Sequence, residues 1–460
     1  MMVGDSRERW GTRLGFILAA VGSAVGLGNM WRFPYLTAEH GGAGFVLFYI
    51  VLLFLVGLPV MIGEFILGRS SRRSPVQALA QKGETDWHIL GFLFVLTGFG
   101  ILSYYSVIGG WTIRYMLDSL TGELLAVEAG DYFRDIQSGI DALLFHLLFM
   151  GITTGIVLGG VRRGIERSVK LLIPLLVCLS VGLAIWAYFQ PGSLEGYAFY
   201  LAPEWGRLIQ TYHPWGFSIT FLNLSLLASA AGQTFFTLSL GMGAMITYAS
   251  YLSSDEDLIE ESLLISLSNF GISFLAGLMI FPIIFSVGLV EEIGESTMGA
   301  LFITVPGAFR SIGGIWGGFL SLIFFFCLLL AALTSGISLL EVVTSSLIDE
   351  FNFSRRPAAL ASGTVIFLGG IPAAMSITWL DFADQIAGGF LLMLGGFFLA
   401  VYLGWFFKTA SSELDKGLKL SLKTTWLILI RYIVPPALLA LLIWISWDLG
   451  ISLAEFLPFS

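Results

Sequence analysis

Charged residues are scarce in this chain. Asp, Glu, Lys and Arg make up 12% of its 460 residues, whereas a typical soluble domain has about 25%. Apolar residues make up 56% and the mean hydropathy is +0.87, so a fold in water would expose large apolar patches. This scarcity excludes an ordinary soluble domain and predicts an all-α protein that lies in the lipid bilayer.

Cysteine and histidine are also sparse. The two cysteines, Cys178 and Cys327, both lie in apolar runs, which favours packing roles and excludes a disulfide framework or a Cys-x-x-Cys metal site. The four histidines are scattered, and no His-Glu-x-x-His, Gly-x-Ser-x-Gly or paired-aspartate motif is present. An intramembrane enzyme would need such a group of residues, so we expect that the protein is not an enzyme. We also expect no nucleic-acid partner.

The chain has long apolar runs in place of charge. A helix that crosses the hydrocarbon needs about 20 mostly apolar residues, and eleven such runs are joined by short loops. We therefore expect a single membrane domain at 13–460, after an N-terminal tail at 1–12. The predicted spans lie near 13–37, 42–68, 90–120, 140–159, 166–189, 216–250, 260–290, 316–348, 358–376, 383–407 and 425–447.

The distribution of Lys and Arg predicts the orientation of these spans. Positive residues gather at one set of loop ends, for example Arg162 and Arg163, and are rare at the opposite ends. Because positive charges favour the cytoplasmic side, we expect a multi-pass protein of the cell membrane with its N-terminus inside. Eleven spans then place the C-terminus outside. No small-residue cleavage site follows the N-terminal charges, so we expect a retained tail rather than a signal peptide.

Two spans are interrupted by glycine pairs. The tetrapeptides Gly-Leu-Gly-Asn at 26–29 and Gly-Met-Gly-Ala at 241–244 occupy corresponding places in two five-span halves, 13–189 and 216–407, with 425–447 left as an eleventh helix. Glycine-mediated helix packing is the simpler interpretation, but it favours Gly-x-x-x-Gly spacing. Unwound backbone at this depth is tolerated where it lines a cavity. Freed carbonyls and half-helix ends then predict a site for a zwitterion and a cation.

At these residues the sequence resembles the neurotransmitter:sodium symporter family, especially its bacterial amino-acid transporters. The resemblance runs from Arg7 to about Trp447. It implies a 5+5 inverted repeat with broken helices one and six, and sodium-coupled import of apolar or aromatic L-amino acids by alternating access. A proton-coupled amino-acid transporter of a related inverted-repeat class is the alternative. The motifs that carry the resemblance are RERWGTRLGFILAAVGSAVGLGNMWRFPY, GGAGFVLFY, GLPVMIGEFILGR, QTFFTLSLGMGAMITYASY and LTSGISLLE.

The resemblance implies two sodium sites built from oxygen ligands without a protein carboxylate. Such a shell suits a monovalent cation, whereas calcium sites recruit Asp or Glu. The substrate carboxylate would complete the first site. Its protein ligands would come from Ala24, Asn29, Thr237 and Asn269. The second site would use the carbonyls of Gly22, Val25 and Ala331 and the hydroxyls of Thr334 and Ser335.

The resemblance also implies a substrate site. The substrate carboxylate would meet the Leu27 and Gly28 amides and the Tyr105 hydroxyl. Gly26 stands where monoamine transporters of the family have Asp, which favours an amino acid over an amine. The side-chain pocket holds no charge, so an apolar side chain is expected because an unpaired buried charge is costly. The amino group would meet Ala24, Phe236, Thr237 and Ser239, and the pocket would be lined by Ile101, Tyr105, Phe236, Met242, Ser335 and Leu339.

The resemblance also implies two gates. Arg32 lies inside an apolar span, where an ionisable residue is usually functional, and Asp384 is its expected partner at the outer gate. Tyr105 and Phe236 would form the lid. The inner gate would pair Arg7 with Asp349, supported by Ser250 and Tyr251, although a solvated surface pair is the default for two such residues.

Gly164 and Pro174 are separated by nine residues in the predicted fifth span. Members of the family with this spacing are thought to unwind there and release the inner sodium. A capped helix start followed by a proline kink is an equally good interpretation.

A chloride site is the last feature that the resemblance implies. Chloride-independent bacterial relatives place a carboxylate at or near position 273, where this chain has serine. One negative charge would help to balance two sodium ions in a site of low dielectric constant. We therefore favour chloride involvement and make no prediction of the oligomeric state. The expected chloride residues are Tyr49, Gln233, Thr237, Asn269 and Ser273.

Overall fold

The structure is a computed structural model that describes residues 8–82, 87–212, 219–253, 256–288, 300–407 and 420–456. Nearly all of this part is helical, as predicted. Nine helical segments are long and apolar enough to cross a membrane, and the bent pair α1 (Arg13–Ala24) with 28–39 makes a tenth. The expected span at 216–250 is divided into α12 (Leu224–Thr237) and α13 (Ala244–Ala249). The all-α class is confirmed, and the count of eleven stays a prediction.

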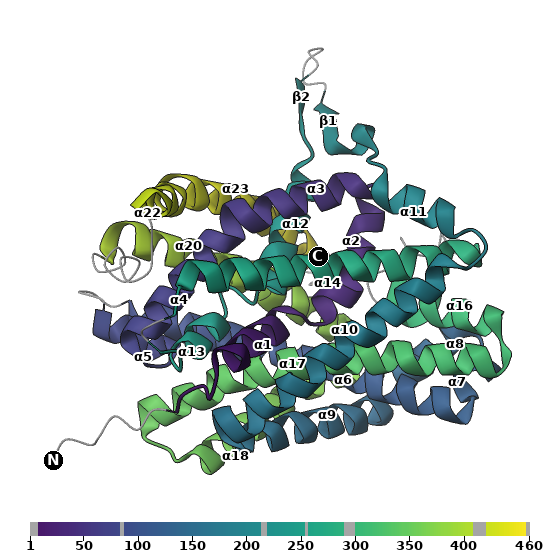
Figure 1. The fold of residues 1–460 in the computed structure, drawn as a ribbon, viewed down its shortest axis with the longest axis horizontal. Helices are drawn as coiled ribbons and strands as arrows, with labels where there is room; N and C mark the ends of the chain where they lie inside the picture. The colour runs from purple at the N-terminus through teal and green to yellow at the C-terminus, as the bar shows by residue number, and fades with distance from the viewer. Residues whose placement is uncertain are drawn as a thin grey trace.

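The remaining elements follow in chain order (Figure 1). In the first half they are η1 (Gly28–Arg32), α2 (Phe33–Glu39), α3 (Ala43–Leu52), η2 (Leu53–Gly57), α4 (Leu58–Ser71), α5 (Pro75–Lys82), α6 (His88–Thr121), α7 (Glu123–Ala126), α8 (Ala129–Ile136), α9 (Ile140–Leu158), η3 (Val161–Glu166), α10 (Arg167–Tyr188), α11 (Ser193–Leu201) and η4 (Trp205–Leu208). In the second half they are α14 (Leu258–Ser286), η7 (Ala300–Thr304), α16 (Val305–Ile312), α17 (Gly314–Phe351), α18 (Arg355–Met375), α19 (Ile377–Ala383), η8 (Asp384–Leu391), α20 (Leu392–Val401), η9 (Tyr402–Phe406), α22 (Leu420–Ile428), η10 (Leu429–Ile433) and α23 (Val434–Phe456).

One hairpin interrupts the helical pattern. β1 (Ile209–Tyr212) pairs antiparallel with β2 (Ile219–Leu222), and the hairpin projects from the bundle (Figure 1). The sixth span was expected to begin at 216, but the helix starts at Leu224, where the Asn223 side chain caps it by accepting a hydrogen bond from the Leu226 amide at 3.2 Å. The apolar sequence of β2 is compatible both with a strand and with the start of a membrane-spanning helix.

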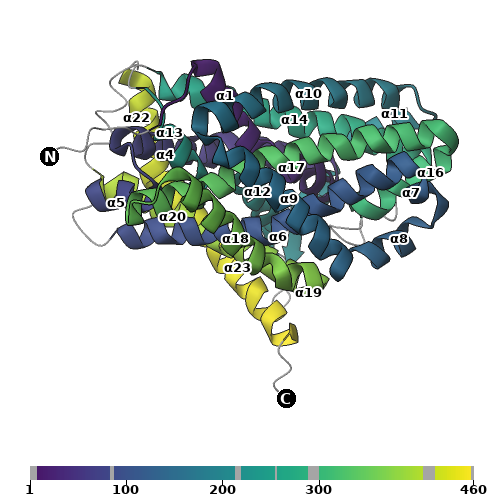
Figure 2. The same cartoon turned by 90° about the horizontal axis from the view of Figure 1, so that it is seen from below.

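Helix α17 lies at the centre of the bundle. It packs against α6, α10, α18, α9 and α1, and 83% of its most apolar 18-residue window is buried. Figure 2 shows α17 between α10 and α14 on one side and α6 and α9 on the other. Only 28% of the corresponding window of the segment 161–188 is buried, so that segment presents much of its apolar surface outward. The site described below is built around α17.

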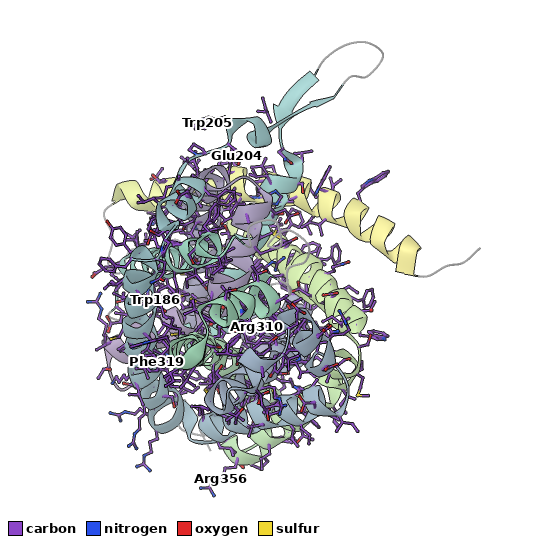
Figure 3. The ribbon with its side chains drawn as sticks, turned by 90° about the vertical axis from the view of Figure 1, so that its right-hand side faces the viewer. Trp186, Glu204, Trp205, Arg310, Phe319 and Arg356 are labelled. Atoms are coloured by element: carbon purple, nitrogen blue, oxygen red, sulfur yellow. The ribbon has the colours of Figure 1, made fainter. Side chains whose placement is uncertain are left out.

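Large apolar side chains cover much of the outside of the bundle. Phe319 and Trp316 are 49% and 70% exposed, and Figure 3 shows Phe319 and Trp186 at the edge of the helices. Contiguous exposure of this kind is unfavourable in water and suits contact with lipid. The outer surface therefore agrees with the membrane location that the composition predicted.

Candidate functional site

The first span is broken where the glycines predicted. Helix α1 ends at Ala24 because Val25 adopts an extended conformation (φ −94°, ψ 97°), and helix resumes at Gly28 with a bend of 48°. The Gly26 amide, which would have continued the helical ladder, donates instead to Asn29 Oδ1 at 3.0 Å. Backbone oxygens around 22–25 are thereby free to face the interior of the protein.

The sixth span is broken between Thr237 and Ala244. Gly241 (φ 72°) and Gly243 (φ 76°) take left-handed conformations that glycine adopts at little cost,. A Cβ atom on Gly241 would collide with the Leu392 carbonyl oxygen. The Gly241 amide donates to the buried Glu64 Oε1 at 2.8 Å. Ser239 is also left-handed (φ 52°), a conformation that is unfavourable for a residue with a side chain.

A cavity lies between the two breaks. All of the predicted substrate residues line it except Leu27, whose amide donates to the Tyr105 hydroxyl at 3.1 Å. Gly26 faces the same space, and a Cβ there would lie 2.9 Å from the Tyr105 hydroxyl oxygen and closer still to Ser335 Oγ. The structure thus brings together segments from α1, α6, α12 and α17 around one cavity.

Sequence reasoning missed Ser23, which also lines the cavity. Its carbonyl accepts hydrogen bonds from Ser239 Oγ at 2.8 Å and Ser335 Oγ at 3.0 Å. Its hydroxyl donates to Ser338 Oγ at 2.8 Å. Ser23 therefore connects the first, sixth and eighth spans. Its place between Gly22 and Ala24, both expected to bind sodium, was the signal that could have found it.

The oxygens expected at the first sodium site converge beside the cavity. Asn269 Oδ1 lies 3.0 Å from the Ala24 carbonyl oxygen and 3.2 Å from the Thr237 carbonyl oxygen, and Asn29 Nδ2 donates to it at 2.6 Å. With its N–H group turned toward them, the Asn269 amide donates to both carbonyls, because the two ends of an amide are assigned from the hydrogen-bond network. This buried, neutral donor set fits a monovalent cation.

The residues expected at the second site meet between α1 and α17. Thr334 Oγ1 lies 3.3 Å from the Val25 carbonyl oxygen and 3.0 Å from that of Ala331, and Ser335 Oγ lies 3.3 Å from that of Gly22. All five residues are buried. Their oxygens come from two helices and include no carboxylate, so this set also fits a monovalent cation.

The residues expected to bind chloride form a buried hydrogen-bonded group next to the residues expected at the first sodium site. Tyr49 and Thr237 share a hydrogen bond between their hydroxyls at 3.0 Å, and Asn29 Nδ2 donates to Ser273 Oγ at 2.8 Å. Gln233 Nε2 donates to the Gly28 carbonyl at 2.7 Å, which links the cluster to the broken first span. Within the described residues, the Gln233 Oε1 atom is buried without a hydrogen-bond partner.

The two residues expected to form the outer gate, Arg32 and Asp384, are not in contact with each other. Within the described residues, no ion pair of 4.0 Å or less joins Arg32 to Asp384. The Tyr104 hydroxyl donates to Asp384 Oδ1 at 2.6 Å. The Arg32 guanidinium carbon lies 5.3 Å from the ring centroid of Phe236, which lines the cavity. Arg32 is therefore stacked over the expected lid.

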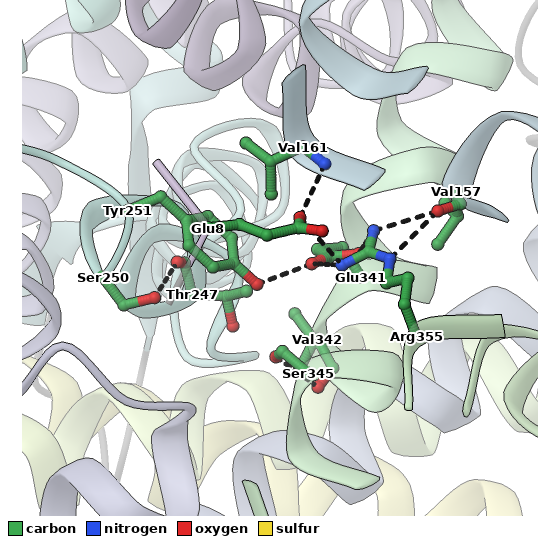
Figure 4. Close-up of polar contacts among 10 residues, drawn as sticks. All are labelled: Glu8, Val157, Val161, Thr247, Ser250, Tyr251, Glu341, Val342, Ser345 and Arg355. Atoms are coloured by element: carbon green, nitrogen blue, oxygen red, sulfur yellow. Dashed lines mark hydrogen bonds and ion pairs between the residues drawn. The ribbon is translucent and has the colours of Figure 1, made fainter. Parts of the chain in front are cut away.

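A group around Glu341, which we call the inner group, lies near the residues expected at the inner gate and differs from the expected pair. Arg355 donates to both carboxylate oxygens of Glu341 at 2.7 and 2.6 Å, and Tyr251 donates to Glu341 Oε1 at 2.6 Å (Figure 4). Glu341 is fully buried, so its charge requires these partners. Ser250 donates to the Thr247 carbonyl at 2.6 Å. Sequence reasoning missed Arg355 because its partner lies fourteen residues away across a helix break.

The inner pair expected from the sequence, Arg7 with Asp349, can be followed only for Asp349. Arg7 lies outside the described residues. Asp349 Oδ2 accepts a hydrogen bond from the Ser74 amide at 2.6 Å, and Arg73 lies 3.6 Å from Oδ1. Gly164 lies in the π-helical turn η3 and Pro174 lies inside α10, so the segment is wound in this structure. Its unwinding stays a prediction.

Two broken helices that present neutral oxygens to one shared cavity define a cation-coupled membrane transporter of the broken-helix class. The chain belongs to the Sodium:neurotransmitter symporter family, which it matches over residues 7–135 and 132–449. It is a multi-pass, sodium-dependent transporter, and its relatives are transporters rather than enzymes, as predicted.

Three relatives show how far the likeness extends. An uncharacterized sodium-dependent transporter of Haemophilus influenzae is 33% identical, over 96% of this chain and 98% of the relative. The uncharacterized sodium-dependent transporter YhdH of Bacillus subtilis is 32% identical, over 94% and 96%. The crystal structure of MhsT in complex with L-phenylalanine is 37% identical, with a TM-score of 0.85 over 95% of this chain and 99% of MhsT.

Proposed function

We propose that this transporter imports apolar and aromatic L-amino acids together with sodium. The observation that carries the proposal is the cavity, which is lined by no charged side chain and by the Tyr105 hydroxyl, to which the Leu27 amide donates at 3.1 Å. These donors suit a substrate carboxylate, and the carbonyls beside them suit its ammonium group. The remaining lining, including Ile101 and Leu339, suits an apolar side chain. The L-phenylalanine bound to MhsT supports the same substrate class.

The substrate carboxylate and two sodium ions would share the site. We assign the first ion to Ala24, Asn29, Thr237 and Asn269, where the substrate carboxylate completes the shell. The convergence of the Asn269 side chain with the carbonyls of Ala24 and Thr237 beside the cavity supports this assignment. The second ion would lie among the oxygens of Gly22, Val25, Ala331, Thr334 and Ser335.

Transport would proceed by alternating access. The open Arg32–Asp384 pair and the closed group around Glu341 support an outward-facing starting arrangement. Binding would draw Arg32 and Asp384 together over Phe236, after which the first and sixth spans would move against α6, α9, α17 and α18. The mutual packing of these four helices supports a single scaffold. A cytoplasmic N-terminus and a location in the cell membrane belong to the same proposal.

Uptake by purified protein in proteoliposomes tests the function. Radiolabelled phenylalanine and leucine should accumulate with an inward sodium gradient and not when potassium replaces sodium. Unlabelled tryptophan should compete, and lysine should not, because its ammonium group would be buried without a partner. Equal competition by lysine would contradict the apolar pocket. Uptake driven by a proton gradient in sodium-free buffer would favour the proton-coupled alternative.

Chloride is a second ligand that one observation favours. The buried group around Tyr49, Gln233 and Ser273 contains hydroxyl and amide donors and no carboxylate. An anion there would offset part of the charge of two sodium ions. Uptake should fall when gluconate replaces chloride, and full activity in gluconate would refute chloride binding.

A further inference from the structure

The N-terminal segment and the start of the fifth span exchange hydrogen bonds from amide to carboxylate. Glu8 Oε2 accepts a hydrogen bond from the Val161 amide at 2.8 Å (Figure 4). In return, Glu166 Oε2 accepts a hydrogen bond from the Gly11 amide at 2.6 Å. Each segment thus supplies the acceptor for an amide of the other, and the two carboxylates lie at the two ends of η3 (Val161–Glu166).

Glu166 also holds the beginning of the first span. Its Oε1 atom accepts hydrogen bonds from Thr12 Oγ1 at 2.9 Å and from Lys170 Nζ at 2.6 Å. Thr12 is the N-cap of α1, since its hydroxyl accepts a hydrogen bond from the Gly15 amide at 3.0 Å. Glu166 is only 3% exposed, and a Cβ on Gly11 or Gly15 would press on its carboxylate. Glycine at both positions allows this close approach.

Glu8 is held at the turn between the fourth and fifth spans. A Cβ on Gly160, which has a φ of +76°, would lie 2.8 Å from Glu8 Oε1. On its other side Glu8 lies 3.5 Å from Arg355, which also donates to the Val157 carbonyl and to Glu341. The carboxylate therefore lies among the ends of α9, η3 and α18, although its side chain is 42% exposed.

The two connected segments flank the second sodium site. Helix α1 supplies the carbonyls of Gly22 and Val25, and α10 packs against it from the other side. A Cβ on Gly22 would lie 3.1 Å from both Ile173 of α10 and Thr334 of α17. Movement of α1 away from α10 would break the hydrogen bonds of both Glu8 and Glu166. It would leave the Val161 and Gly11 amides to find other acceptors.

We propose that Glu8 and Glu166 form a reciprocal carboxylate clamp, in which each is a positioning residue that ties the inner end of the first span to the start of the fifth. The clamp makes the inner ends of these two spans open together. Exposure of the second sodium site from inside therefore requires both span ends to move. This inference rests on the proposed alternating access. It differs from the expected gate of Arg7 and Asp349 because its carboxylates accept hydrogen bonds from backbone amides, Val161 in one direction and Gly11 in the other.

Hydrogen–deuterium exchange of the full-length protein in nanodiscs tests the clamp. The variants are Glu8→Ala, Glu166→Ala and the double variant, compared with and without sodium. Loss of Glu8 should speed exchange at least threefold at 161–165 and also at 11–16, where Glu8 accepts no hydrogen bond. Loss of Glu166 should likewise speed exchange at 161–165 as well as at 11–16. The exchange rates of the double variant in these two segments should be at most twofold higher than those of either single variant.

Glu128→Ala is the matched control. Glu128 accepts hydrogen bonds from the Gly130 and Asp131 amides at 2.9 and 3.0 Å, so it performs the same chemistry at the start of α8. Its loss should speed exchange at α8 and leave residues 11–16 and 161–165 unchanged. If removing a carboxylate speeds exchange only at the amide that this carboxylate had bound, the clamp is overturned. If Glu166→Ala does not fold, the exchange rates of Glu8→Ala, which changes a more exposed residue, decide between the two outcomes.

Transport kinetics provide a second readout. Loss of either carboxylate should raise the half-saturating external sodium concentration at least threefold, because the inner side opens more often. Glu8→Gln and Glu166→Gln, which keep an acceptor oxygen, should have smaller effects than the alanine variants. An unchanged sodium dependence would count against the clamp. A wild-type protein that takes up no amino acid would refute the proposed function, whereas the exchange experiment needs no transport.

Discussion

The Tyr104 hydroxyl donates a 2.6 Å hydrogen bond to Asp384, the carboxylate that was expected to face Arg32. Asp384 thus has a partner in this structure while Arg32 is stacked on Phe236, and the proposed cycle would bring the two charges together. Closure would exchange a neutral hydrogen-bond donor for a charged one, and charge-assisted hydrogen bonds are the stronger kind.

Replacement of Asp384 by asparagine should slow transport without preventing binding. An amide retains a hydrogen bond to Tyr104 but removes the charge that would attract Arg32. We expect turnover in proteoliposomes to fall by at least tenfold, about 1.4 kcal/mol, while substrate affinity by scintillation proximity changes less than threefold. Equal losses of both would show that Asp384 serves binding rather than closure.

Replacement of Gly26 by alanine should remove the space for the substrate. The new Cβ would lie 2.9 Å from the Tyr105 hydroxyl oxygen and closer to Ser335 Oγ. Overpacking of this kind costs roughly 1–3 kcal/mol, so we expect phenylalanine affinity to fall about tenfold or more. Gly232→Ala is the control, because a Cβ there meets nothing within 4 Å. Similar losses in both variants would contradict the steric argument.

The left-handed backbone of Ser239 gives a test with two matched substitutions. Glycine and alanine both remove the hydroxyl that donates to the Ser23 carbonyl, but only glycine adopts a φ of 52° easily. Because the left-handed conformation costs a residue with a Cβ roughly 1–2 kcal/mol, Ser239→Ala should be less stable than Ser239→Gly. Thermal unfolding in detergent checks the order. A higher melting temperature for the alanine variant would refute the strain.

Removal of the Thr334 hydroxyl should weaken sodium binding. Thr334→Ala takes one oxygen from the group shared with Val25 and Ala331, and we expect the half-saturating sodium concentration to rise about tenfold, which corresponds to about 1.4 kcal/mol. Thr97→Ala is the control, since that buried hydroxyl donates to the Leu93 carbonyl of its own helix at 2.8 Å. An equal rise in the control would assign the effect to general loosening of the bundle.

The glycine pairs made the two helix breaks predictable, because their spacing is poor for helix packing and their cost within a helix is known. The left-handed conformation of Ser239 carries no such signal, since serine rarely adopts it. The inner group around Glu341 was missed because pairing between Glu8, Arg355 and Glu341 depends on how distant segments fold together. The hairpin was missed because an apolar run of four residues at 219–222 suits a strand or a helix,.

Helix α17 runs without interruption through 38 residues, and three parts of the transport site depend on its register. Ala331 lies at the proposed second sodium site, Ser335 and Leu339 line the cavity, and Glu341 belongs to the inner group. Ten residues separate the first from the last, about 15 Å at 1.5 Å per residue. One inserted residue would rotate every later side chain of α17 by about 100° around the helix axis. An insertion or deletion in α17 between 331 and 341 would therefore misalign the proposed ion site, the cavity and the inner group with one another.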